Sequence, residues 1–199
     1  MIDFQLFTAL VTYNLIMFVT PGPNNAMLTA SGMKFGIKKT LPHLIGIPTG
    51  HVVQVILVCY GLGNLFLAFP QIQFYMKVLC AIYLLYLAWK MIGSFNIINK
   101  NAGGRPLRLY EAALFQLINP KAWTIAVGGV SGFFPTEETL FVGTMFVTIT
   151  TALIAPSISI WMFFGNTLRL YIKKDKTKKI VEFSLAVLLV ITAIFIVIK

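Results

Sequence analysis

Two stretches of this sequence combine helix-breaking residues with amides inside runs of apolar residues. The first is TPGPNN at residues 20–25, and the second is LINPKAW at residues 117–123. A proline within a helix removes its own N–H and frees the carbonyl four residues earlier. A helix that restarts beyond such a break has unsatisfied N–H groups at the positive end of its dipole. Each break therefore places hydrogen-bond acceptors beside donors, which suits the binding of a small polar solute.

A zwitterion matches this combination of groups. An ammonium can bind the freed carbonyls, which are those of Met17, Val19 and Gln116, while a carboxylate can bind the N-terminus of a half-helix. Lys121 lies well inside an apolar segment and needs an anion there, which a substrate carboxylate can supply. No Asp or Glu of the sequence lies at a similar depth, which favours neutral over cationic amino acids. The expected substrate-binding residues are Pro21, Gly22, Pro23, Asn24, Asn25, Asn119, Pro120 and Lys121.

Further polar residues inside apolar segments can serve transport or packing. His51 and Gln54 share one helical face, and His51 can carry protons because its ordinary pKa is near neutrality. Tyr83, Thr144 and Thr148 are candidates for lining a pathway. Each can equally be a packing residue, and the threonines can bond to their own helix. The two proline breaks can likewise be kinks that only shape packing.

The elements that must position these residues are membrane-spanning helices. The sequence is 58% hydrophobic and 11% charged, against about 25% charged in a typical soluble domain. A membrane-spanning helix needs about 20 mostly apolar residues. Six segments reach that length, roughly 4–30, 41–67, 74–92, 111–130, 140–163 and 181–198. We therefore predict an all-α polytopic membrane protein. The small-residue pair Gly46 and Gly50 is expected to permit close helix packing.

The net charge of +10 comes from basic residues in alternate loops. Positive charge marks the cytoplasmic side, so both termini are predicted on the outer, periplasmic side. This pattern explains the charge as an orientation signal, with binding to anionic membrane lipids secondary. It argues against nucleic acid as a partner. The basic residues are Lys34, Lys38, Lys39, then Lys90, Lys100, Arg105, Arg108, then Arg169, Lys173, Lys174, Lys176, Lys178 and Lys179.

The chain divides near its middle into two sets of three spans. The polar stretch 94–108 separates them, and because three is odd the second set must be inserted upside down, as in inverted-topology repeats. A Ser-Gly pair follows Pro21 after 10 residues and Pro120 after 11, which agrees with a repeat whose first helix is broken in each half. The predicted division is a half-repeat at 1–93, a cytoplasmic linker at 94–109 and a half-repeat at 110–199.

The sequence shows no metal, hydrolase or P-loop pattern, so we expect a transporter without cofactors rather than an enzyme. Uphill transport would then draw on an ion gradient or a partner. Two alternatives remain open. A membrane-embedded thiol oxidoreductase would need cysteines beside the breaks, whereas Cys59 and Cys80 lie elsewhere. A membrane assembly protein would show no saturable transport.

Four motifs carry a resemblance to a known family. They are TPGPNNAMLTASGMKFGIKKTLPHLIGIPTGH, CAIYLLYLAWKMI, LINPKAW and IWMFFGNTLR. Together they resemble the LysE-type amino-acid exporters, in the branch of homoserine/threonine and cysteine/O-acetylserine exporters. The resemblance implies export of a small amino acid across the bacterial inner membrane, coupled to protons as an antiport. The doubled Asn is more similar to the cysteine/O-acetylserine exporters than to the lysine exporter. A homo-oligomer is compatible with the sequence.

Overall fold

The computed structural model describes residues 4–92, 104–133, 140–171 and 175–198, and most of the predicted linker lies outside them. These residues form helices and no strand, which confirms the all-α prediction. The elements are α1 (Phe4–Val19), α2 (Pro23–Phe35), α3 (Ile37–Leu57), the π-type segment η1 (Val58–Leu62), α4 (Gly63–Ala68), α5 (Pro70–Met91), α6 (Leu109–Ile118), α7 (Pro120–Phe133), α8 (Leu140–Tyr171) and α9 (Asp175–Ile198).

Three helices are long and apolar enough to cross a membrane within the described ranges. They are Ile37–Leu62, Pro70–Trp89 and Lys179–Ile198, and the bent pair α1–α2 would make a fourth. The predicted fourth span is divided at Pro120 into α6 and α7, each too short to cross alone. The predicted fifth span falls on α8, where the side chains of residues 140–155 are not described. Six spans in two inverted repeats therefore stay a prediction.

The second predicted span differs from the observed helix at both ends. The helix begins at Ile37, four residues before the predicted start, and it turns at Gly61 before the predicted end. Gly61 has a φ of 97°, a left-handed conformation that glycine adopts without steric cost. The turn directs the chain into the short α4, after which Pro70 begins α5. Proline is well suited to this position because its missing N–H would be unpaired there anyway.

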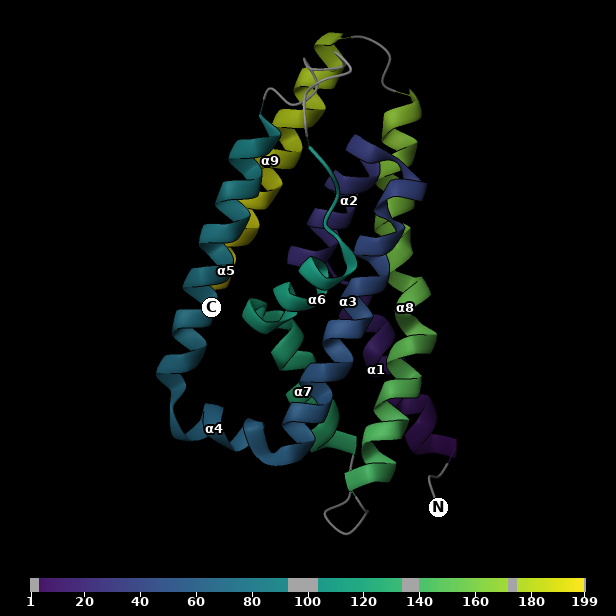
Figure 1. Ribbon diagram of the computed structural model, residues 1–199, viewed down its shortest axis with the longest axis vertical. Helices are drawn as coiled ribbons and strands as arrows, with labels where there is room; N and C mark the ends of the chain where they lie inside the picture. The colour runs from purple at the N-terminus through teal and green to yellow at the C-terminus, as the bar shows by residue number, and fades with distance from the viewer. Residues whose placement is uncertain (1–3, 93–103, 134–139, 172–174, 199) are drawn as a thin grey trace.

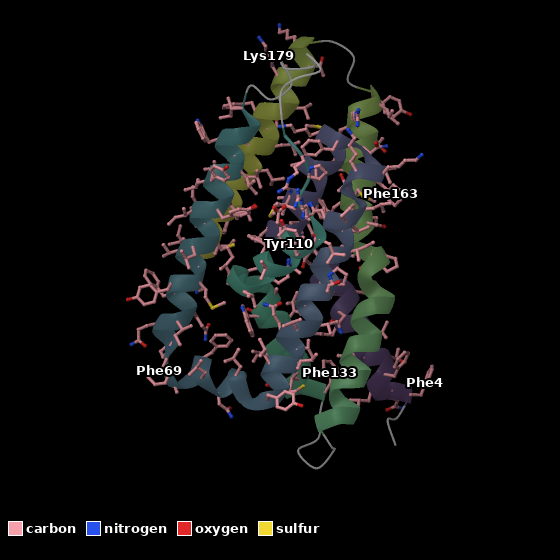
Figure 2. All side chains as sticks on the ribbon, viewed as in Figure 1. Phe4, Phe69, Tyr110, Phe133, Phe163 and Lys179 are labelled. Atoms are coloured by element: carbon pink, nitrogen blue, oxygen red, sulfur yellow. The ribbon has the colours of Figure 1, made fainter. Side chains whose placement is uncertain are left out.

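The helices form two groups, shown in Figure 1. α5 and α9 lie side by side along one flank, and α2, α3 and α8 run along the other, with α6 and α7 between. Large apolar side chains stand outward at the periphery in Figure 2, among them Phe4, Phe69 and Phe163. An apolar exterior of this kind is what lipid contact requires.

Glycines bring two helix pairs into backbone contact. Gly165 of α8 faces the carbonyl of Thr29 in α2, with no room for a methyl group between them. Gly46 and Gly50 of α3 lie in the same way against carbonyls of α6, which confirms their expected packing role. Small residues at such crossings let helix backbones approach closely.

We expect Gly165→Ala to destabilise the fold by about 1–3 kcal/mol, because the added methyl would overlap the Thr29 carbonyl. Thermal unfolding of the detergent-solubilised protein measures the effect. Gly132→Ala is the matched control, since a methyl there meets no atom within 4 Å. Equal unfolding midpoints for the two variants would contradict the close crossing.

Candidate substrate-binding site between the helix breaks

The first break lies between α1 and α2, where the sequence predicts it. α2 begins at Pro23, and its axis is bent by 58° from that of α1. Pro21 cannot donate the hydrogen bond that would continue α1. The Asn25 side chain supplies hydrogen bonds at the break, because its Nδ2 donates to the carbonyls of Phe18 and Thr20 at 2.8 and 2.7 Å. Asn25 thus holds the end of α1 against the start of α2.

The second break is the single residue Asn119, between α6 and α7. Its backbone is extended, with φ −83° and ψ 104°, and α7 starts at Pro120. The Asn119 side chain is buried, and its Oδ1 has no hydrogen-bond partner among the described residues. It borders a void of about 20 Å³ together with Asn24 and Asn25. The predicted amides from both breaks therefore meet in one place.

The three carbonyls freed by the prolines each accept a bond from a side chain. The donors are Thr20 Oγ1 to Met17 (2.9 Å), Trp161 Nε1 to Val19 (3.2 Å) and Gln54 Nε2 to Gln116 (2.7 Å). These bonds satisfy the backbone where lipid offers no partner. A carbonyl oxygen has two lone pairs, so each can still accept a second donor. Binding of a substrate ammonium by these carbonyls stays a prediction.

A buried amide chain connects the two breaks, and its central residue is Gln116. The Gln116 side chain is fully buried and exchanges two hydrogen bonds with Asn24, at 2.9 and 3.1 Å. Asn119 Nδ2 donates to the same Gln116 oxygen at 3.4 Å. Gln54 extends the chain to His51, whose Nδ1 lies 3.3 Å from Gln54 Oε1. The side chain of Gln116, unlike its carbonyl, was not predicted as part of the site, although a glutamine inside an apolar run is a signal for a buried polar contact.

Lys121 joins the second break to the first. Its Nζ donates to the carbonyls of Thr20 (2.5 Å) and Pro21 (3.1 Å) and to Thr20 Oγ1 (2.9 Å). The aliphatic part of Lys121 lies over Gly22, where an added Cβ would come within 2.8 Å of its Cδ. The Lys121 ammonium thus bonds to backbone carbonyls at the first break. Carbonyls at the breaks are the groups predicted to bind the ammonium of a substrate.

A cavity of about 740 Å³ opens beside both breaks, and we call it the break cavity. Its walls include Pro21, Pro120 and Lys121 from the breaks, and side chains of α5 and α9. Lys77 of α5 adds a second cation, and it makes no ion pair or hydrogen bond with any described residue. No acidic side chain lines the cavity within the described part of the chain. The volume falls within the range of about 300–1,000 Å³ usual for small-molecule sites.

Residues 15–199 match the model of a family described as "LysE type translocator". The chain belongs to this family. Among the curated relatives of this LysE-family chain is the cysteine/O-acetylserine efflux protein of Salmonella typhimurium, 29% identical over 163 residues, which are 81% of this chain and 79% of the relative. The protein of that name from Escherichia coli (strain K12) is 30% identical over 131 residues, 64% of this chain and 65% of the relative. No solved structure matches.

Family membership and the apolar helices make this a multi-pass membrane protein. The remaining predicted site residues of the LysE-family chain lie in three places. His51 and Gln54 are buried in the amide chain behind the breaks. Tyr83 lines a different cavity, described below. Thr144 and Thr148 belong to α8, but their side chains lie outside the described part of the structure.

Proposed function

We propose that the protein exports a small neutral amino acid or derivative across the bacterial inner membrane by proton antiport, with both termini outside. The observation that supports this most strongly is the break cavity, because one chamber touches both interrupted helices. Discontinuous helices near the middle of the membrane commonly build the substrate sites of secondary transporters. The curated relatives named cysteine/O-acetylserine efflux proteins point to a small amino acid with a polar side chain.

Lys121 defines the proposed binding step. In the structure its ammonium bonds to Thr20 and Pro21. An arriving substrate presents its own ammonium to these acceptors, and the released Lys121 pairs with the substrate carboxylate. Lys77, in the same cavity, offers that carboxylate a second cation. Binding of one substrate therefore exchanges the bonds of Lys121 to the backbone for two new interactions. Lys121 forms an ion pair with the substrate carboxylate, and the substrate ammonium takes over the hydrogen bonds to Thr20 and Pro21.

The lining of the break cavity supports a neutral substrate. Lys77 and Lys121 are its only charged side chains among the described residues. A second positive charge on the substrate would lie near these cations without a carboxylate to compensate it, which is unfavourable at low dielectric. Cationic amino acids are therefore disfavoured relative to neutral ones.

The cysteine positions do not support a thiol oxidoreductase. Cys80 is buried in α5 and Cys59 is part of η1, and neither lines the break cavity. Both cysteines are free thiols.

The proposal is tested by counterflow in proteoliposomes, with O-acetyl-L-serine, L-cysteine, L-threonine, L-homoserine and L-lysine as labelled substrates. We expect saturable exchange for at least one neutral member and none for L-lysine. Absence of exchange for every member would contradict the proposed function, and exchange of L-lysine alone would contradict the neutral substrate class.

We expect His51→Gln to uncouple transport from protons. The sequence contains two histidines, and His51 is the one connected to the breaks through Gln54 and Gln116. Glutamine can keep a hydrogen bond to Gln54 but cannot take up a proton at physiological pH. An imposed pH gradient should then fail to drive accumulation, while counterflow without a gradient continues. Gradient-driven accumulation at the wild-type level would exclude His51 as the coupling group.

A further inference from the structure

A second cavity, of about 450 Å³, lies away from the helix breaks, and we call it the His43 cavity. Its lining comes from α2, α3, α5, α9, residues 104–107 and the start of α6. No residue of either break borders it. It contains Tyr83, which the sequence marks as a pathway candidate, and it lies at the end of the molecule that carries Lys34 and Arg105. That end is the predicted cytoplasmic side.

His43 is the unusual member of this lining. Its side chain is 2% exposed, and neither ring nitrogen has a hydrogen-bond partner among the described residues. An unpaired buried polar group costs about 1–3 kcal/mol, and native proteins leave few of them. The equally buried His51, by contrast, is bonded to Gln54. The bond to Gln54 therefore satisfies one nitrogen of His51, whereas both nitrogens of His43 are left open to a ligand by the described residues.

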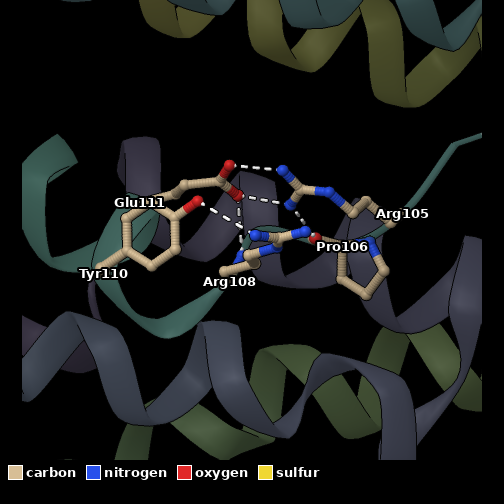
Figure 3. A network of polar contacts seen from close by, with 5 residues as sticks. All are labelled: Arg105, Pro106, Arg108, Tyr110 and Glu111. Atoms are coloured by element: carbon tan, nitrogen blue, oxygen red, sulfur yellow. Dashed lines mark hydrogen bonds and ion pairs between the residues drawn. The ribbon is translucent and has the colours of Figure 1, made fainter.

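The charges around the His43 cavity favour an anionic group on that ligand. Lys34 and Arg105 are its cations, and Glu111 is its single acid within the described residues. Glu111 already accepts hydrogen bonds from the Arg105 guanidinium at 2.5 Å and from the backbone N–H of Arg108 at 2.8 Å. Figure 3 shows these contacts. The hydrogen bonds that Arg105 donates to Glu111 also raise the pKa of Arg105, so the guanidinium stays charged. The net charge of the lining is positive.

A neutral imidazole offers one donor and one acceptor on the same ring. A zwitterionic amino acid presents groups of both kinds, together with the carboxylate that the cations favour. We infer that the His43 cavity is a second binding site for a small amino acid, in which the net positive charge of Lys34, Arg105 and Glu111 attracts the carboxylate and His43 bonds to the ammonium or polar side chain. The identity of the ligand rests on the proposed function, whereas the need for a partner at His43 does not.

The two cavities lie in series along the α5–α9 pair. The His43 cavity is lined by Tyr83 of α5 and Leu189 of α9, and the break cavity by Lys77 and Thr192 of the same helices. Along α5, Cys80 and Ala81 lie between Lys77 and Tyr83, and both belong to a cluster of buried apolar residues. The His43 cavity thus forms an entry site, which is separated from the break cavity along α5 by these buried residues.

Equilibrium binding of labelled O-acetyl-L-serine to the purified full-length protein tests the inference. We expect two sites per wild-type chain, with one lost in His43→Leu and the other lost in Lys121→Met. One wild-type site that survives His43→Leu and disappears in Lys121→Met would overturn the entry site and leave the proposed function intact. No binding to wild type would count against both. His43→Gln, which keeps a donor and an acceptor, should retain more binding than His43→Leu.

A second measurement does not depend on how His43 variants fold. Ala30 of α2 lines the His43 cavity and is partly exposed, so Ala30→Cys in a Cys59→Ala, Cys80→Ala background places one thiol there. A membrane-impermeant maleimide should alkylate it from the side of the basic loops alone, and O-acetyl-L-serine should slow that reaction at least threefold. Val127→Cys, in the break cavity, is the matched control for the other site. O-acetyl-L-serine could instead protect the control thiol and leave the alkylation rate at position 30 unchanged. That result would overturn the entry site.

Discussion

Lys121→Met is expected to lower transport at limiting substrate concentration by about 10- to 100-fold. The variant removes a cation whose hydrogen bonds to charged or polar groups are each worth about 1.5–3 kcal/mol, and about 1.4 kcal/mol corresponds to a factor of ten. Methionine has a similar length and is apolar, so it can remain over Gly22 without the ammonium. Initial rates of labelled amino-acid exchange in proteoliposomes give the measurement.

Two further variants separate the charge of Lys121 from its position. Gly22→Ala keeps the ammonium but adds a methyl within 2.8 Å of the Lys121 Cδ, so it should displace the side chain from Thr20 and Pro21 and reduce transport less than Lys121→Met does. Lys77→Met removes the other cation of the break cavity and leaves the bonds of Lys121 untouched. Wild-type exchange kinetics in Lys121→Met would rule out the proposed binding step.

Gln116→Leu should reduce both stability and transport, the stability by about 1–3 kcal/mol. Leucine fills most of the volume but leaves the amides of Asn24 and Asn119 without their bonds to Gln116, and an unpaired buried amide carries a penalty of this size. The measurements are the thermal unfolding midpoint in detergent and the counterflow rate in proteoliposomes. We expect the rate to fall at least tenfold, because the connection between the two breaks is lost.

The double variant Asn24→Leu, Gln116→Leu distinguishes structure from function. Replacing both partners of a buried hydrogen bond by apolar groups can be nearly neutral, so the double variant should be more stable than Gln116→Leu alone. The coupling between the two positions should be about 0.5–3 kcal/mol. Transport should stay low, because neither amide remains. Recovery of transport together with stability would mean that the amides serve folding only.

The sequence was sufficient to predict features that depend on local chemistry. Pro21, Pro23 and Pro120 lack an N–H, and the breaks that they predict are observed: α1 ends before Pro21, and α2 and α7 begin at Pro23 and Pro120. Gly46 and Gly50 are spaced one helical turn apart on α3, and that spacing predicted a close crossing. The family was likewise recognisable from the motifs that contain these residues.

Features that depend on which helices meet could not be predicted in this way. Gln116 bonds to Asn24 across 92 positions of sequence, and Lys121 bonds to Thr20 across 101. Nothing local to Lys121 indicates that its ammonium contacts backbone carbonyls of α1. The position of Lys77 in the cavity was missed for the same reason, since only the packing of α5 near both breaks brings it there.

The glycine crossings have a consequence for motion during transport. Where α2 meets α8 and α3 meets α6, backbone touches backbone, so these helices have little freedom to slide and should move as one block. The α5–α9 pair is then the part expected to move when the break cavity opens to one side of the membrane and then to the other. Phe74 and Tyr75 of that pair are exposed apolar side chains, on a surface expected to contact lipid. The turnover rate should accordingly respond to acyl-chain length and bilayer thickness, so the host membrane itself would act as a regulator of export.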